Sequence, residues 1–192
     1  MKWYKYDIRD LTDEEYAYWY LLMNADKRKR VDRFRIIDDK KRTVAGEMLA
    51  RKAIAKWCNI EPESITFAIG EHGKPYVVDL DVEFNISHSS NLVVCAVDNR
   101  LVGIDIELIR PIDLSVAKRV CTDDDLLYVF GHKPTEADFV YTEDEEILRR
   151  FFEVWTRKEA LIKLGNDKCS LEKHYYHKNE FQYVISIATY MV

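Results

Sequence analysis

Apolar residues recur along the chain with two different spacings, and each spacing predicts its own kind of element. Residues 3–8 alternate between apolar and polar positions, which predicts an opening strand. A capping box begins at Thr12 and predicts a helix that runs through Met23. Apolar residues then return every three or four positions over about residues 38–57, so a longer helix is expected there.

The spacing falls to two in the middle of the chain and returns to the helical value after Pro111. Strands are expected over residues 65–69, 82–87, 92–98 and 101–107, with a turn over residues 71–75. Helical segments are expected over about residues 114–120, 123–130 and 142–164, and Gly165 ends the last of them. Residues 174–190 alternate again, and residues 183–188 are the clearest strand in that stretch.

Helices precede strands in each half of the chain, and the division falls near Asn99. This order predicts an α+β fold of two similar units, residues 1–99 and residues 100–192, without a flexible linker between them. A chain of 192 residues with 47% hydrophobic side chains can bury roughly 70% of its unfolded surface, so a sizeable core is expected.

The N-terminus lacks the apolar core of a signal peptide, and no apolar run approaches the roughly 20 residues that a membrane helix requires. The four cysteines lie far apart in the sequence and form no C-x-x-C pair, which favours free thiols in a reducing cytoplasm. We therefore expect a cytoplasmic protein that does not contact the membrane.

Charge is distributed unevenly behind a net value of −5, a value that disfavours a generic nucleic-acid binder. Residues 27–42 carry nine basic and three acidic side chains, whereas residues 123–146 carry nine acids against Lys133 alone. Each run can be a solvated helix face. The alternative is that the basic stretch binds phosphates or an acidic partner, and composition alone does not decide between the two.

Gly103-Ile104-Asp105-Ile106-Glu107 is the most informative local motif. On a strand, Asp105 and Glu107 share one face while the two isoleucines anchor the other. Two neighbouring carboxylates repel unless a cation lies between them, so the pair is a candidate site for a hard metal ion. An acid pair on the wet face of an ordinary strand is the alternative.

Two further motifs have both a structural and a functional interpretation. Glu159 and Lys163 are four residues apart on a predicted helix, as in an ordinary surface pair, but Trp155 one turn earlier suggests that this face is covered. His88 lies among hydroxyl residues at a strand end, where it fits either a capped turn or a phosphate ligand. Lys74, on the Gly-Lys-Pro turn, likewise has both a structural and a functional interpretation.

The four motifs occur in a definite order: Gly-Lys-Pro at 73–75, Phe-Asn-Ile-Ser-His-Ser at 84–89, Gly-Ile-Asp-Ile-Glu at 103–107, and Trp-x-x-Lys-Glu-Ala-x-x-Lys at 155–163. Their combination resembles the 4′-phosphopantetheinyl transferases, most closely the monomeric, pseudo-symmetric class that activates nonribosomal peptide synthetases and other carrier-protein systems. The similarity extends from the opening strand to Gly165. It implies two α+β subdomains with the active site in the cleft between them.

The resemblance implies transfer of 4′-phosphopantetheine from coenzyme A to a serine of an acyl or peptidyl carrier protein, with 3′,5′-ADP as the leaving group. Asp105, Glu107 and Glu159 match the family's magnesium-binding acids. Lys163 matches a cation that contacts the phosphates, and Lys158 is a weaker candidate for the same role. Glu159, or a water near the metal, is the hypothesis for the general base.

The resemblance also assigns to coenzyme A a set of side chains outside the metal site: Lys27, Arg30, Thr43, Lys74, Ser87 and His88. Lys27 and Arg30 match cations that bind the nucleotide phosphates, Thr43 a hydroxyl beside the 3′-phosphate, and Lys74 an adenine-side contact. Some of the basic residues can instead face the carrier protein, which is typically acidic.

The sequence departs from the family pattern after Gly165, where Asn166-Asp167 replaces the usual Gly-x-Gly turn. Because few residues follow, a trimmed C-terminal sheet is expected. This departure motivates a second hypothesis, a non-catalytic module that binds coenzyme A or a carrier protein. A magnesium-dependent nucleotide hydrolase is a third. The complete set of acids and Lys163 favours the active transferase.

Overall fold

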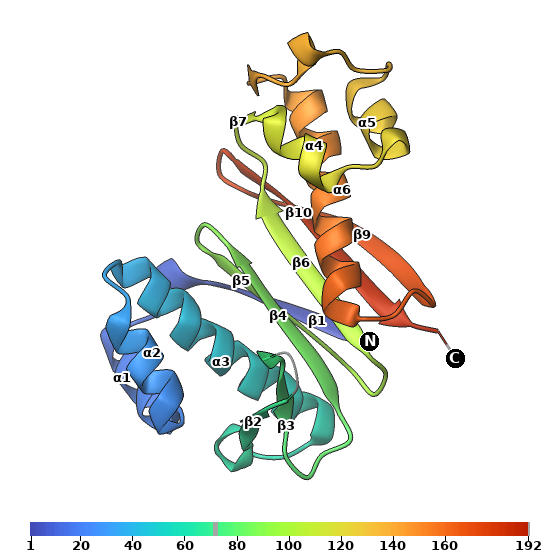
Figure 1. The fold of residues 1–192 in the computed structure, drawn as a ribbon. Helices are drawn as coiled ribbons and strands as arrows, with labels where there is room; N and C mark the ends of the chain where they lie inside the picture. Colours follow the sequence, from blue (N-terminus) through green and yellow to red (C-terminus); the bar gives the residue numbers. More distant parts are fainter. Residues whose placement is uncertain (71–72, 192) are drawn as a thin grey trace.

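Two three-stranded antiparallel sheets pack face to face at the centre of the molecule, in a computed structural model that describes residues 1–70 and 73–191 (Figure 1). The N-terminal sheet has the order β1-β5-β4, formed by Lys2–Asp7, Leu92–Asp98 and Glu83–Ser89. The C-terminal sheet has the order β6-β10-β9, formed by Val102–Leu108, Phe181–Tyr190 and Cys169–Lys178. The α+β class predicted from the sequence is confirmed.

One long helix covers the outer face of each sheet. Helix α3 (Ile37–Cys58) packs on the N-terminal sheet, and helix α6 (Glu145–Leu164) packs on the C-terminal sheet. Val93 and Cys95 of β5 belong to the core under α3, whereas Val94 and Ala96 belong to the core between the two sheets. Because both faces of β5 are buried, its sequence is a continuous apolar run. The layers are therefore helix, sheet, sheet and helix.

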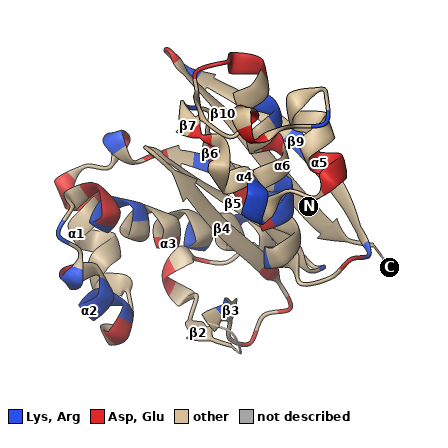
Figure 2. Cartoon of the chain, turned by 45° about the horizontal axis from the view of Figure 1, so that its top comes forward, with Lys and Arg blue, Asp and Glu red and all other residues tan. Residues whose placement is uncertain are grey.

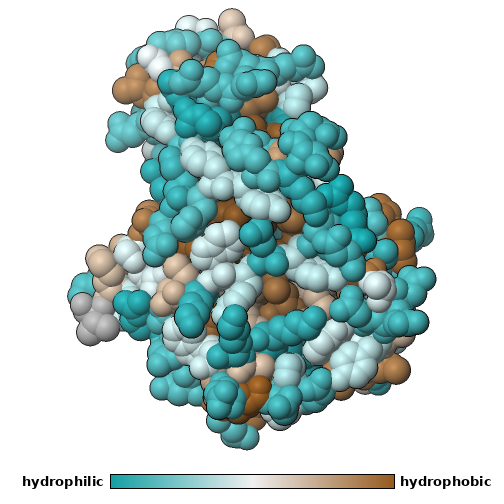
Figure 3. Space-filling view, turned by 180° about the vertical axis from the view of Figure 1, so that it is seen from behind, coloured by the Kyte–Doolittle hydropathy of each residue, from teal (hydrophilic) through white to brown (hydrophobic). Residues whose placement is uncertain are grey.

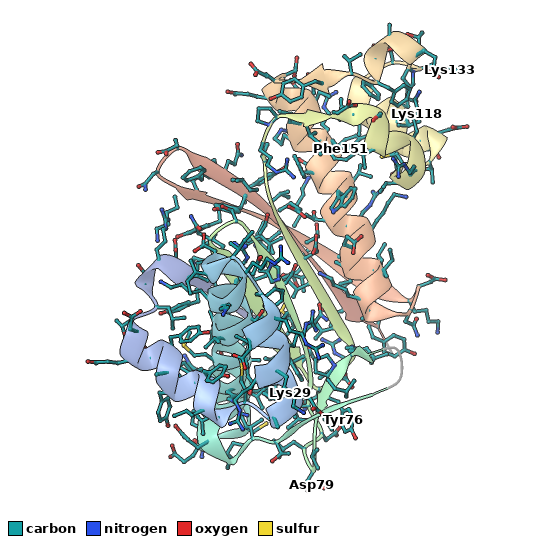
Figure 4. The ribbon with its side chains drawn as sticks, turned by 60° about the vertical axis from the view of Figure 1, so that its left-hand side comes forward. Lys29, Tyr76, Asp79, Lys118, Lys133 and Phe151 are labelled. Carbon is teal, nitrogen blue, oxygen red and sulfur yellow. The ribbon has the colours of Figure 1, made fainter. Side chains whose placement is uncertain are left out.

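The remaining elements flank these layers. Helices α1 (Asp13–Leu22) and α2 (Ala25–Arg33) lie against α3, and the short strands β2 (Phe67–Ile69) and β3 (Pro75–Val77) pair beside it (Figure 1). Helices α4 (Ala117–Val120) and α5 (Asp123–Phe130), with strands β7 (Ile112–Asp113) and β8 (Tyr141–Thr142), form a lobe over the first turns of α6. Phe151 of α6 is fully buried in the apolar cluster beneath this lobe (Figure 4).

Most predicted elements are present, with small shifts at their ends. α1, α3 and α5 and the strands β4, β5 and β6 begin and end within two residues of their predicted bounds. α6 begins three residues later than predicted, because Asp144 accepts the hydrogen bonds that cap it and Thr142 pairs in β8. Gly165 ends α6 with a left-handed φ of 74°, as predicted. Residues 71 and 72 of the predicted turn lie outside the described residues.

Several elements differ from the predictions. The basic stretch contains the helix α2, for which no element was predicted, and β3 follows the turn at Gly73. The last alternating region is a hairpin of two ten-residue strands, β9 and β10. The C-terminal sheet consequently has as many strands as the N-terminal sheet.

The surface shows little that is apolar on the side opposite to the view of Figure 1, where hydrophilic residues surround scattered apolar ones (Figure 3). Within the described residues, no helix is long and apolar enough to span a membrane. The four cysteines are free thiols, of which Cys95 is fully buried.

Candidate active site

Side chains of β4 hydrogen-bond to β6 across the boundary between the two halves, and we call this contact the seam. The backbone N–H of Ile104 donates to Asn85 Oδ1 at 2.9 Å, and that of Leu108 donates to Ser89 Oγ at 3.0 Å. Asn85 and Ser89 share a strand face with Ser87, because side chains alternate along a strand. The face of β4 that carries these three polar residues therefore follows β6 along its length.

The two carboxylates of the Gly-Ile-Asp-Ile-Glu motif lie in this seam. Ser87 Oγ donates to Asp105 Oδ1 at 2.7 Å, and Ser89 Oγ donates to Glu107 Oε2 at 2.8 Å. Ile104 on the opposite face of β6 is fully buried between the two sheets. The predicted alternation, with acids on one face and isoleucines on the other, is confirmed.

Lys163 brings helix α6 to the same place. Its Nζ lies 2.6 Å from Asp105 Oδ1 and donates at 3.1 Å to Ser87 Oγ and at 3.3 Å to the carbonyl of Ile104. Three elements from both halves thus meet at one ammonium group. Lys163 also lines a pocket together with Lys74 and Asn85, so the Gly-Lys-Pro turn and the end of α6 share one opening.

Gly103 explains how α6 comes so close to β6. A Cβ atom at this position would lie 2.7 Å from the backbone nitrogen of Leu164 and still closer to the carbonyl oxygen of Ala160. Only glycine leaves room for a helix backbone at this distance. The contact holds the turn of α6 that carries Glu159 and Lys163 against β6.

Burial, together with neighbouring charges, shifts the pKa values of two groups at the seam. Burial, with a contribution from the charge of Asp105, raises the pKa of Glu107, and the Ser89 hydrogen bond opposes this shift. Partial burial and the positive charges of Arg42 and Lys163 lower the pKa of His88. A carboxylate pair therefore lies beside a group of basic side chains, an arrangement that suits phosphate oxygens held together with a metal ion.

Asp105 offers a direct test of whether a metal ion fits. Its Oδ2 atom is buried and has no hydrogen-bond partner among the described residues. Buried carboxylate oxygens are rarely left unsatisfied, and oxygen ligands are those that Mg²⁺ prefers. Asp105 and Glu107 therefore fit one side of a magnesium site. Glu159 is half-buried on α6, and within residues 1–70 and 73–191 no three acidic, His or Cys side chains stand close enough to form a complete metal site.

Three lysines that the family resemblance assigned to coenzyme A already pair with carboxylates. Lys27 Nζ lies 2.8 Å from the buried Glu47, which also pairs with Arg51. Lys74 Nζ lies 3.5 Å from Glu83 Oε2. Lys158 Nζ lies 2.8 Å from Asp125 Oδ2. These cations are not gathered around the seam as free groups.

The other predicted residues of the N-terminal half lie on α2 and α3. Arg30 is exposed on α2, a helix that carries several basic residues (blue in Figure 2). Thr43 is half-buried, and its hydroxyl donates at 2.9 Å to the carbonyl of Asp39 one turn earlier. Arg42 stands closer to the seam, because its guanidinium donates at 2.8 Å to the carbonyl of Ser90 at the end of β4.

Sequence reasoning missed two residues of the site. Arg42 was counted within the basic stretch but not singled out, and no local pattern distinguishes it from its neighbours. Ser89 carries a usable signal, because it lies two residues after Ser87 and must share its strand face. That spacing also pairs the two serines with two acids that are themselves two residues apart, Asp105 and Glu107.

Known proteins of one family match the chain over nearly its whole length. Residues 10–100 match the family model of the 4′-phosphopantetheinyl transferase N-terminal region, and residues 101–182 match that of the 4′-phosphopantetheinyl transferase superfamily. The 4′-phosphopantetheinyl transferase Sfp of Bacillus subtilis (strain 168) is 35% identical over 167 residues, which cover 86% of this chain and 70% of the relative.

Two further relatives extend the comparison. The 4′-phosphopantetheinyl transferase gsp of Aneurinibacillus migulanus is 34% identical over 176 residues, covering 90% of this chain and 70% of its own length. The 4′-phosphopantetheinyl transferase HetI of Nostoc sp. is 34% identical over 153 residues, covering 76% of this chain and 60% of its own.

Proposed function

The chain belongs to the 4′-phosphopantetheinyl transferase superfamily, and we propose that it transfers 4′-phosphopantetheine from coenzyme A to a serine of an apo acyl or peptidyl carrier protein, with release of 3′,5′-ADP. The contact of Lys163 with both Asp105 and Ser87 is the observation that carries the placement of the site. It brings an acid and a cation of the C-terminal half against a strand of the N-terminal half.

Asp105, Glu107 and Glu159 are the residues proposed to hold Mg²⁺. The ion, when bound, supplies positive charge that offsets the negative charge developing on the pyrophosphate. Asp105 contributes its Oδ2 atom, which has no partner within residues 1–70 and 73–191, and Glu107 lies on the same strand face. Glu159 belongs to the turn of α6 that Gly103 holds against β6.

Cationic side chains at the seam are proposed to bind the phosphates of coenzyme A. During transfer, the carrier serine oxygen bonds to the phosphorus that carries pantetheine, and the bond from that phosphorus to the bridging oxygen breaks. Lys163 stabilises the charge on the phosphate oxygens, while His88 and Arg42 hold the nucleotide side. Glu159 is proposed to accept the proton that the serine hydroxyl loses.

The rest of coenzyme A is proposed to extend along the N-terminal half. Lys27, Arg30 and Thr43 are assigned to the nucleotide phosphates, together with Ser87, and Lys74 to the adenine side of the shared pocket. Lys27 must then share its charge between the ligand and Glu47. We further propose a monomer, because one chain supplies both sides of the seam, and a reducing cytoplasmic environment, because the cysteines are free thiols.

Mass spectrometry of intact carrier proteins tests this function. The protein is incubated with coenzyme A, Mg²⁺ and a panel of apo acyl, peptidyl and aryl carrier proteins. We expect one phosphopantetheine to be added to at least one carrier, and none to a carrier whose acceptor serine is replaced by alanine. A folded protein that modifies no carrier in the panel contradicts the proposal.

A further inference from the structure

A buried carboxylate outside the seam holds α6 from the side of α5. Asp125 of α5 is 7% exposed, and its Oδ2 accepts from the backbone N–H and the hydroxyl of Thr122 at 2.9 and 2.8 Å. Two consecutive residues of α6 complete its surroundings: Arg157 Nη2 lies 2.5 Å from Oδ1, and Lys158 Nζ lies 2.8 Å from Oδ2. The ionised carboxylate is thus surrounded by donors.

The ion pair with Asp125 keeps the ammonium group of Lys158 away from other anions. Burial opposes ionisation of Asp125, but the hydrogen bonds from Lys158 and Thr122 outweigh it and hold the pKa of Asp125 well below its usual range. Removing one partner of a buried ion pair leaves an uncompensated charge, so such pairs are costly to break. Moving Lys158 to a phosphate would break this one, whereas Lys163 already lies at the seam.

The pair of Asp125 and Lys158 also restrains the orientation of α6. Helix α5 reaches α6 at two points on one of its faces, through Asp125 and, three residues later, through Tyr128, whose hydroxyl donates to Glu153 at 2.5 Å. Lys158 directly precedes Glu159, so a restraint at position 158 acts on the turn that carries the proposed metal ligand. Rotation of a helix by even part of a turn changes which side chains face the neighbouring strand.

We propose that Lys158 is a positioning residue: Asp125 holds it, and through it fixes the turn of α6 that directs the next residue, Glu159, to the seam, whereas Lys163 is held there by its own contacts with Asp105 and Ser87. Lys158 does not bind the phosphates of coenzyme A. The catalytic consequence rests on the proposed function, whereas the pairing and the absence of a phosphate contact do not.

The affinity for coenzyme A distinguishes a lysine that binds its phosphates from a lysine that only positions α6. By calorimetry, Lys158→Met is expected to bind coenzyme A within about twofold of the wild-type Kd, because no phosphate contact is lost. Lys163→Met serves as the comparison and is expected to bind at least about tenfold more weakly. Lys168→Met, an exposed lysine just beyond α6, is the matched control without effect. A tenfold loss of affinity in Lys158→Met overturns the proposal.

Kinetics and melting then test the connection to Asp125. Lys158→Met and Asp125→Asn are each expected to lower kcat roughly 10- to 100-fold with the KM for coenzyme A nearly unchanged, since a small misplacement of catalytic groups has effects of this size. The double variant should match Asp125→Asn in kcat and in melting temperature, because the second change removes nothing further. Lys158→Arg should restore most of kcat.

Other results would contradict either the positioning role of Lys158 or the proposed function, and the two cases can be told apart. Additive effects in the double variant, or a normal kcat in Asp125→Asn, overturn the positioning role. A wild-type protein that modifies no carrier contradicts the proposed function instead. In that case the binding and melting measurements still decide whether Lys158 pairs with Asp125 or contacts coenzyme A.

Discussion

At the scale of single residues, Asp105 combines features that stability alone does not explain. One of its oxygens accepts from Ser87 and pairs with Lys163, while the other is buried without a partner among the residues that the structure describes. An unsatisfied buried acceptor costs roughly 1–3 kcal/mol. An arrangement that retains this cost is typical of a site in which a ligand completes the contacts.

Replacing Asp105 by asparagine tests this interpretation with little change in shape. Asp105→Asn keeps an oxygen for Ser87 but removes the negative charge proposed to bind the metal. We expect kcat/KM for carrier modification to fall by at least about 100-fold, the effect typical of losing a preorganised electrostatic contact. Circular dichroism should show an intact fold. Asp123→Asn, at an exposed position of α5, is the control, and wild-type activity in Asp105→Asn would contradict the metal assignment.

Glu153 is a second buried acid, and both of its carboxylate oxygens have donors. Lys173 Nζ and Arg149 Nη1 lie 2.7 and 2.5 Å from its oxygens, and the hydroxyls of Tyr128 and Tyr175 also donate to it. Burial alone would raise its pKa, but these donors lower it to about 2. Glu153 therefore contributes to stability through its ionised form.

The low pKa of Glu153 predicts a stability difference that depends on pH. Its contribution is fully present above the ordinary pKa of about 4.5 and is lost as the pH falls toward about 2. Glu153→Gln lacks this contribution at every pH. We expect the wild type to melt at a higher temperature than Glu153→Gln at pH 6, and the gap to narrow steadily between pH 4.5 and 3. A gap independent of pH would show that the ionised form is not stabilising.

At the scale of elements, the closeness of α6 to β6 depends on a single residue, Gly103. Gly103 lies under Ala160 and Leu164, and Glu159 and Lys163 directly precede these two residues in α6. A larger residue would push the helix outward and carry both side chains with it. The glycine of the Gly-Ile-Asp-Ile-Glu motif therefore serves helix packing, whereas its acids serve the site.

Gly103→Ala is expected to destabilise the protein by about 1–3 kcal/mol, because backbone atoms of α6 cannot yield as a flexible side chain can. Carrier modification should fall together with stability, since the helix that carries Lys163 is displaced. Gly46→Ala in α3 is the matched control: its Cβ would meet Ile86 at an ordinary 3.4 Å, and alanine favours the helix. Urea unfolding of both variants measures the difference, and equal stabilities would contradict the close-packing explanation.

Local patterns predicted the elements that present one clearly apolar face or a strong boundary. α3 and α5 met their predicted bounds closely, and Gly165 ended α6 as expected. α2 was missed because Val31 is its only buried residue, so it has no apolar periodicity to detect. Its signal was the cap, since Asn24 accepts the N–H of Lys27 at 2.9 Å.

The site was predictable only in part for a related reason. The acids and serines of the seam follow from period-two spacing, because it fixes which side chains share a face. The pairing of Lys158 with Asp125 and of Lys27 with Glu47 depends on how separate elements pack. Spacing within one element contains no information about such contacts, so those lysines looked free in the sequence.

At the scale of the whole molecule, the two halves meet along two lines of side chains. Besides the seam between β4 and β6, three contacts join β1 to β9: the rings of Trp3 and His174 at 5.3 Å, Lys5 over the ring of Tyr176 at 4.7 Å, and Asp7 with Lys178 at 2.7 Å. Each contact lies two residues further along both strands than the one before. The strands therefore run in the same direction in both lines, and the apolar sheet faces are enclosed between them.

This enclosure predicts that the halves unfold together. Val94 of β5 is fully buried between the sheets, so Val94→Asp places an unpaired charge in contact with both. Such a charge is expected to cost at least about 3 kcal/mol. Hydrogen exchange measured by mass spectrometry should show lower protection in peptides from α3 and from α6 alike, although neither helix contains the substitution.

Val140→Asp is the matched control, because the same substitution at a side chain that is 53% exposed should leave protection unchanged in both helices. Loss of protection confined to α3 in Val94→Asp would mean that the C-terminal half holds its fold without the inter-sheet core. In that case the seam, which needs β4 and β6 side by side, would depend on the β4 to β6 hydrogen bonds and on Lys163 alone. Joint loss would instead make the position of every group at the seam a property of the complete four-layer packing.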